Sequence, residues 1–196
     1  YILFFKYVIP SILGLLAISS ASIIDGYFVG NYVGAVGLAS INISYPITTV
    51  LFGLALMFAV GSSVIVGKLM GENNTKDASN VFTKSIITVS FISIVVCIIL
   101  YFSLGNILDI LKVQDELREK TFLYLPILLI FLPFLMTAIV LDYFVRVDEN
   151  PNLSFAALFL SSLINVGLDY LFIVKYDWGI SGAAYATGIS QAAIIL

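Results

Sequence analysis

The chain has 196 residues, of which 61% are hydrophobic and only 11% are charged. Soluble domains carry about 25% charged residues, so this chain has too little polar surface to face water on all sides. The net charge of −3 without a basic stripe argues against nucleic acid as a partner, and the lack of histidine excludes His-ligated metals and nucleophile–histidine pairs within this chain.

Long uncharged runs divide the chain into segments that match the length of membrane-spanning helices. A helix of about 20 apolar residues crosses the hydrocarbon core of a bilayer. Most of the runs have about this length, but residues 26–67 form a run twice as long that contains a glycine-rich break at residues 30–34. The predicted spans are residues 4–32, 41–67, 84–105, 121–144, 153–174 and 179–196. The sequence therefore predicts an all-α membrane protein, a bundle of six transmembrane helices.

Polar segments connect the predicted spans. Residues 68–77 hold turn formers at their centre, and residues 146–151 form a charged turn whose proline suits the first turn of the next helix. Residues 106–120 mix charged residues with leucines, which predicts a short helix lying in the membrane interface. Lysine and arginine divide five against four between the two sides, and this excess predicts a cytoplasmic N-terminus. Because the chain starts without Met and stops within an apolar run, we expect it to be part of a longer protein.

Prolines interrupt two of the predicted spans, Pro10 in the first and Pro46 in the second. A proline inside a helix removes one hydrogen bond and permits bending. Bent or broken helices often flank polar sites in alternating-access transporters, although many other membrane helices also tolerate proline. Pro10 is therefore a candidate bending point of the first helix.

Three carboxylates lie inside predicted spans, namely Asp25, Asp142 and Asp169. An ionisable group inside a span costs about 2.5–3.5 kcal/mol on insertion scales, so each is a candidate functional residue. For Asp25 the alternative is that the first helix ends at Ile24, which would leave the carboxylate among the lipid headgroups. Residues 27–29 continue the apolar pattern, so we favour a position inside the span.

The other two carboxylates have partners four residues away, on the same helix face. Asn165 and Asp169 could together supply oxygens to a cation or share a proton. The alternative is a hydrogen-bonded pair that only holds neighbouring helices together. Asp142 lies four residues before Arg146, which favours a local ion pair at the cytoplasmic membrane surface.

Helix rise predicts a common depth for several of these polar residues. Asp169 lies eight residues before the turn at residue 177, and Thr187 lies ten residues after it. Asp25 lies nine residues before the break at residue 34. At about 1.5 Å per residue these positions reach similar depths, although spacing does not show which helices are neighbours. The expected set is Asp25, Asn165, Asp169 and Thr187.

Four segments carry a resemblance to a known family. They are Pro10 with residues 25–30, residues 146–151, residues 165–170 and residues 178–187. In this order and spacing they resemble the N-terminal half of the multidrug and toxic compound extrusion (MATE) family of secondary transporters. The resemblance implies one lobe of a two-lobed, twelve-helix transporter, in which a C-terminal lobe faces this one across a central cavity.

The resemblance also implies roles for individual residues. The residues expected to couple transport to a proton or cation are Asp25, Asn165, Asp169 and Thr187. The residue at which the first helix would bend is Pro10. Asp142 and Tyr27 are weaker candidates, because Asp142 lies only at or near the family's polar residue on the fourth helix. The coupling ion would be H⁺ or Na⁺, with Na⁺ as a metal ion held by oxygens of the first four residues, and no cofactor is expected.

The leading functional hypothesis is a multi-pass cell-membrane antiporter that exports cationic, amphipathic drugs or toxins in exchange for H⁺ or Na⁺. Its partners would be small cationic organic substrates, the lipid bilayer and the C-terminal lobe of the same protein. The alternative is a lipid-linked-precursor or polysaccharide flippase of the related fold, which should have a basic cavity, whereas the interior charges here are acidic. An intramembrane aspartyl protease should contain a Gly-x-Gly-Asp element, which is absent, so we expect no enzyme.

Overall fold

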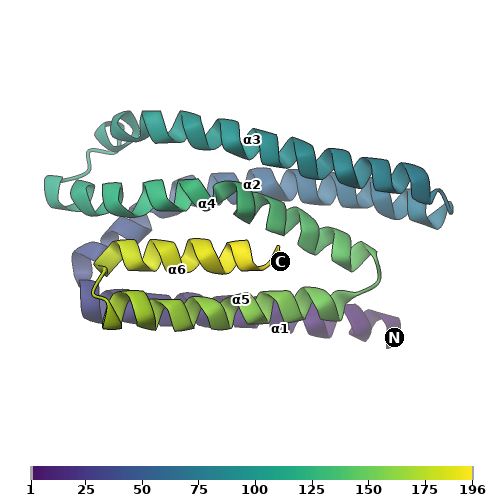
Figure 1. Cartoon of the computed structure of the whole chain (residues 1–196), viewed down its shortest axis with the longest axis horizontal. Helices are drawn as coiled ribbons and strands as arrows, with labels where there is room; N and C mark the ends of the chain where they lie inside the picture. Colours follow the sequence, from purple (N-terminus) through teal and green to yellow (C-terminus); the bar gives the residue numbers. More distant parts are fainter. Residues whose placement is uncertain (1, 196) are drawn as a thin grey trace.

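The structure is a computed structural model that describes residues 2–195, and all of its regular secondary structure is helical (Figure 1). The segments are α1 (Ile2–Phe28), the π-helical η1 (Val29–Val33), α2 (Ala35–Gly71), α3 (Thr75–Ile110), α4 (Asp115–Val147), α5 (Pro151–Asp169), the π-helical η2 (Tyr170–Lys175) and α6 (Gly179–Ala193). The all-α prediction is confirmed for the described residues.

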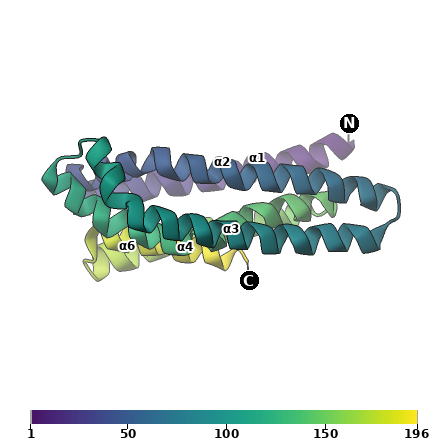
Figure 2. The same cartoon turned by 90° about the horizontal axis from the view of Figure 1, so that it is seen from above.

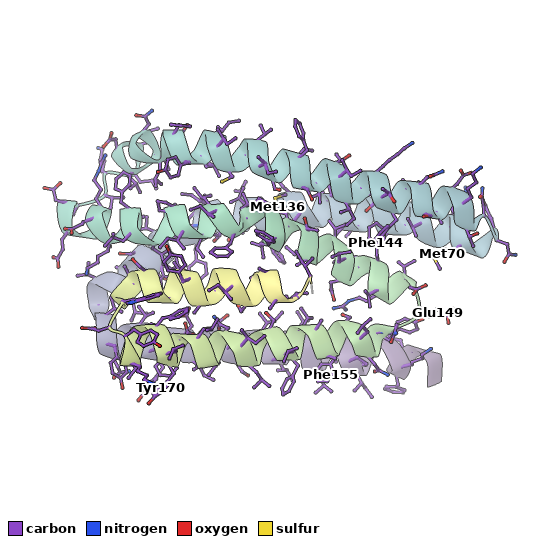
Figure 3. The ribbon with its side chains drawn as sticks, in the orientation of Figure 1. Met70, Met136, Phe144, Glu149, Phe155 and Tyr170 are labelled. Atoms are coloured by element: carbon purple, nitrogen blue, oxygen red, sulfur yellow. The ribbon has the colours of Figure 1, made fainter. Side chains whose placement is uncertain are left out.

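The helices pack as two groups, α2 with α3 and α4, and α1 with α5 and α6. The two groups meet mainly where α4 packs against α6. In Figure 1, α3 lies along one side of the bundle and α1 with α5 along the opposite side, while α2 and α4 lie next to α3. Figure 2 shows the same bundle from above, with the turn between α2 and α3 at one end. Buried side chains of α2, α3 and α4 form the larger apolar core, and Met136 of α4 lies between these helices (Figure 3).

Five segments are long and apolar enough to cross a membrane: Phe4–Val33, Ala35–Gly71, Thr75–Ile110, Asp115–Val147 and Pro151–Lys175. Large apolar side chains on their outer faces are exposed, as expected where lipid replaces water. The sixth helix, α6, has 15 described residues and rises only about 22 Å. The sixth predicted span also included residue 196, which lies outside the described residues.

The helices extend beyond the apolar spans that the sequence predicts. The prediction of a separate interfacial helix at residues 106–120 is wrong, because these residues form the end of α3, a short turn and the start of α4. Arg118 of α4 forms an ion pair with Asp109 of α3 across this turn. The charged residues do not exclude helix here, because Asp115 and Glu116 suit the first turn of α4, where carboxylates interact favourably with the helix dipole.

The break between the first two predicted spans is confined to one residue. Helical winding continues through η1, and Gly34 then takes a φ of 92°, in the region that favours glycine. The Gly34 amide donates to the carbonyl of Val29 at 2.9 Å, which closes the π-helical turn. The chain reverses here. The N-terminus and the α2–α3 and α4–α5 turns lie at one end of the bundle, and the link between η1 and α2 lies at the opposite end (Figure 1).

Small residues let α6 approach its neighbours closely. Gly188 faces α4, and a Cβ added there would overlap the ring of Phe131. Gly182 lies against η2, where a Cβ would be 3.1 Å from the carbonyl carbon of Phe172. Interfaces between membrane helices are enriched in small residues for this reason.

We expect Gly188→Ala to lower the free energy of unfolding by about 1–3 kcal/mol, because the Phe131 ring must leave its place in a packed interface. The matched control is Gly167→Ala in α5, where a Cβ would meet no described atom within 4 Å. That change should be neutral or stabilise by up to about 1 kcal/mol, through helix propensity. Unfolding of the purified protein in detergent measures both values, and equal effects at the two glycines would contradict this description of the interface.

Candidate functional site

Asp25 lies inside the first helical segment and not at its end. α1 continues to Phe28 and η1 to Val33, so the alternative in which the helix ends at Ile24 is wrong. The Asp25 Oδ1 atom is buried and has no hydrogen-bond partner among the described residues. A carboxylate oxygen in this situation has lost its water without a replacement, which is costly unless a proton or cation joins it.

Asp169 is the last residue of α5, and its side chain is fully buried. Both carboxylate oxygens lack a hydrogen-bond partner within residues 2–195. The alternative of a hydrogen-bonded pair that only holds helices together is therefore wrong for Asp169. Asn165, one helical turn earlier, is 9% exposed and lies on the same face of α5.

Three of the four predicted site residues line one cavity of about 250 Å³, which is bordered by α1, α2, α4, α5 and α6. Asp25 comes from α1, Asn165 from α5 and Thr187 from α6. Asp169 does not line this cavity, but it lies close enough to Asp25 for their charges to interact. The structure thus brings the helices of the predicted set together. Asp169 is buried near the cavity but does not line it.

Two tyrosines of the site were missed by the sequence reasoning. Tyr45 of α2 and Tyr124 of α4 both line the cavity, and Tyr124 is 5% exposed and lies within electrostatic reach of Asp25 and Asp169. Counting from the break at residue 34 could have found Tyr45, which lies eleven residues after it. Tyr124 could not be found in this way, because the predicted span begins at residue 121, and only the structure shows that α4 begins at Asp115, nine residues before Tyr124.

Each of the two carboxylate-bearing helices changes to π-helical winding close to its carboxylate. η1 begins four residues after Asp25, and η2 begins directly after Asp169. In η2 the amide of Tyr176 donates to the carbonyl of Leu171 at 3.0 Å, a five-residue spacing like that at Gly34. η1 and η2 are in contact with each other. Single π-helical turns inside α-helices occur frequently at functional sites.

The donor set at this site consists of oxygen atoms. Two carboxylates, one side-chain amide, one hydroxyl and the two phenols suit a proton or a hard cation such as Na⁺. No lysine or arginine is among the residues that line the cavity. Within the described residues no three His, Cys, Asp or Glu side chains form a group that could hold a metal ion. A divalent site made of carboxylates is therefore not indicated.

The weaker candidates lie elsewhere. The Tyr27 side chain is 63% exposed and is not among those lining the cavity. Tyr170 of η2 likewise lies on the outer side of the bundle and is 56% exposed (Figure 3). Pro10 is buried within α1, which continues through it as a helix.

Asp142 forms the predicted ion pair with Arg146, at 2.9 Å from Arg146 Nη2 to Asp142 Oδ2. Only 15% of the Asp142 side chain and 28% of the Arg146 side chain are exposed, so the pair is largely buried within the bundle. Ser154 of α5 donates a hydrogen bond to the other oxygen of Asp142. Arg146 Nη1 donates to Ser11 of α1 at 2.7 Å. The pair therefore joins α4, α5 and α1, and the sequence could not show partners so distant along the chain.

A bundle of long apolar helices around a small cavity that holds a few polar side chains makes this chain a multi-pass membrane protein. The family model described as MatE matches residues 10–171. The chain belongs to the MatE family, and the resemblance inferred from its sequence is confirmed.

Curated relatives carry the name multidrug export protein MepA. The protein of Staphylococcus saprophyticus is 26% identical over 183 residues, which cover 93% of this chain and 41% of the relative. That of Staphylococcus aureus is 28% identical over 189 residues, which cover 96% of this chain and 42% of the relative. The chain thus spans about two fifths of the length of these relatives, a share that agrees with one lobe of a two-lobed protein.

Solved structures show the same fold. An outward-facing multidrug resistance MATE family transporter of the MOP superfamily superposes with a TM-score of 0.92 at 24% identity, over 96% of this chain and 42% of that chain. A MOP superfamily transporter from Pyrococcus furiosus, described as having a binding pocket of reverse polarity, gives 0.91 at 24% identity over the same shares. These relatives are transporters, in agreement with the expectation that the chain is not an enzyme.

We expect Asp142→Ala to lower the free energy of unfolding by about 2–4 kcal/mol, because it leaves a largely buried guanidinium without its carboxylate. Glu72→Ala serves as the control, since it removes an exposed pair with Lys68 at 3.9 Å that should contribute less than about 1 kcal/mol. Unfolding in detergent again gives both values. An Asp142→Ala effect no larger than that of Glu72→Ala would contradict a buried network.

Proposed function

We propose that the protein is a secondary active antiporter that exports cationic, amphipathic drugs or toxins in exchange for H⁺ or Na⁺. The observation that carries the proposal is the pair of buried carboxylates, Asp25 and Asp169. Asp25 lines the mainly apolar cavity, and its Oδ1 atom and both oxygens of Asp169 have no hydrogen-bond partner among the described residues. Such groups gain most from binding a proton or a cation, so an ion gradient can act on them. The names of the curated relatives support multidrug export as the activity of the whole protein.

In this proposal Asp25 and Asp169 take up the coupling ion, and Asn165 and Thr187 supply further oxygens. Binding an ion removes the repulsion between the two carboxylates and so favours a different arrangement of α1 relative to α5. Pro10 would let α1 bend as it moves. The ion thereby shifts the equilibrium between inward-facing and outward-facing states. Binding of the substrate shifts the same equilibrium the opposite way, which couples the two movements.

The charge of the cavity favours cationic substrates over the anionic headgroups that a flippase would handle. Among the described residues that line it, the ionisable groups are one aspartate and two tyrosines. An anionic phosphate would meet no cationic partner here, and its desolvation would not be compensated. The flippase alternative therefore ranks below the drug antiporter.

We expect Asp25→Asn and Asp169→Asn each to reduce ion-driven drug efflux by about tenfold or more, because an amide neither takes up a proton nor offers a cation the negative charge of a carboxylate. The assay uses the full-length protein in liposomes under a proton gradient or a sodium gradient, imposed separately. Asp109→Asn makes the same chemical change at an exposed carboxylate paired with Arg118, and should leave efflux unchanged. Efflux that persists in both site variants would contradict the proposal.

A further inference from the structure

The position of α1 in the bundle depends mainly on one neighbour. α1 packs along α5 and runs parallel to it, while many of its other large side chains are exposed (Figure 1). The face toward α5 carries small residues. A Cβ added at Gly14 would lie 3.0 Å from Leu158 Cδ1, and Ala21 is 6% exposed. Close backbone approach therefore sets where α1, and with it Asp25, stands.

Two long-range hydrogen bonds fix α1 on this face. The Ser162 hydroxyl of α5 donates to the backbone carbonyl of Ala17 at 2.7 Å. Arg146 of α4, held by Asp142, donates to Ser11 at 2.7 Å. Both contacts lie on the Asp25 side of Pro10 in the sequence. The Ser11 hydroxyl also donates to the carbonyl of Tyr7 at 2.8 Å, so the second contact reaches the turn before the proline as well.

The Ser162–Ala17 hydrogen bond also lies near the candidate ion site. Ser162 is three residues before Asn165 on α5, and Ala17 is eight residues, or about 12 Å, before Asp25 on α1. The hydrogen bond thus joins the two helices that supply the carboxylates, about two helical turns from Asp25 on α1. Sliding or tilting of α1 relative to α5 must break or lengthen it.

We propose that Ser162 is a positioning residue for ion coupling, which holds α1 against α5 so that Asp25 stands opposite Asn165 and near Asp169. Arg146, through Ser11, is the second contact that holds α1 in the same place. This inference rests on the proposed function of Asp25, since a positioned carboxylate matters only if it binds the coupling ion. Ser162 also borders the cavity, but its hydroxyl donates to the Ala17 carbonyl, so in this proposal it acts through the position of α1, as Arg146 does.

The test is ion-driven efflux by the full-length protein, measured as a function of the coupling-ion concentration. Ser162→Ala should raise the concentration of coupling ion that gives half-maximal efflux by about threefold to tenfold, the change expected for loss of one hydrogen bond between membrane helices. Ser162→Thr keeps a hydroxyl donor and should restore most of the wild-type value. Ser11→Ala should change the value in the same direction, because it removes the acceptor of Arg146 and leaves the Asp142–Arg146 pair intact.

The matched control is Ser93→Ala in α3. Ser93 is fully buried, and its hydroxyl donates at 2.7 Å to the carbonyl of Ser90 in its own helix. Ser93→Ala should leave the half-maximal ion concentration within about 1.5-fold of wild type, because it removes an equally short hydrogen bond far from α1. A change in Ser162→Ala no larger than in Ser93→Ala, or a Ser162→Thr variant as impaired as Ser162→Ala, would overturn the proposal.

Asp25→Asn, measured in the same assay, separates the two ways in which this inference could fail. If Asp25→Asn abolishes ion dependence and Ser162→Ala does not alter it, the proposed function stands and the positioning role of Ser162 is wrong. If Asp25→Asn itself keeps normal ion dependence, the proposed function fails first.

Discussion

A carboxylate removed from water without a hydrogen-bond partner is costly, and the interior of this bundle contains two of them. Insertion of one such group into a membrane costs about 2.5–3.5 kcal/mol, and an unpartnered ion in a low-dielectric interior costs several kcal/mol. The oxygens of Asp169 and the Oδ1 atom of Asp25 have no partner among the described residues. The rest of the structure has to hold these two groups near each other against that cost.

The two groups of helices, α2–α4 on one side and α1, α5 and α6 on the other, contribute differently to this site. α2, α3 and α4 share a large apolar core that fixes one wall of the cavity. α1 and α5 carry the acids, and they are joined through small residues and the Ser162–Ala17 hydrogen bond. α6 brings Thr187 to the cavity and is fitted against Phe131 at Gly188. Rigid packing therefore surrounds a site whose own polar groups remain unpaired, a common compromise at functional sites.

Much of this arrangement could be predicted from the sequence, because hydrophobic length and helix rise are local properties. Counting residues from the turns placed Asp25, Asn165 and Thr187 at one depth, and they do line one cavity. The same count would have included Tyr45, but aromatic residues in apolar spans are usually core or interface residues and carry no comparable signal. It would not have included Tyr124, because the predicted span begins at residue 121 and α4 begins at Asp115. Hydrogen bonds that cross the bundle could not be found in this way, because their partners are far apart in sequence. Ser162 and Ala17 are separated by 145 residues, and Arg146 and Ser11 by 135.

The central claim is that the oxygens around Asp25 and Asp169 bind the coupling ion. Equilibrium ion binding to the purified full-length protein tests this most directly, through radioactive sodium uptake and through proton release on addition of a cationic drug in unbuffered solution. The account predicts that one of these two signals is present in the wild type and is lost in both Asp25→Asn and Asp169→Asn. An ion-binding signal of wild-type size and affinity in both variants would contradict it.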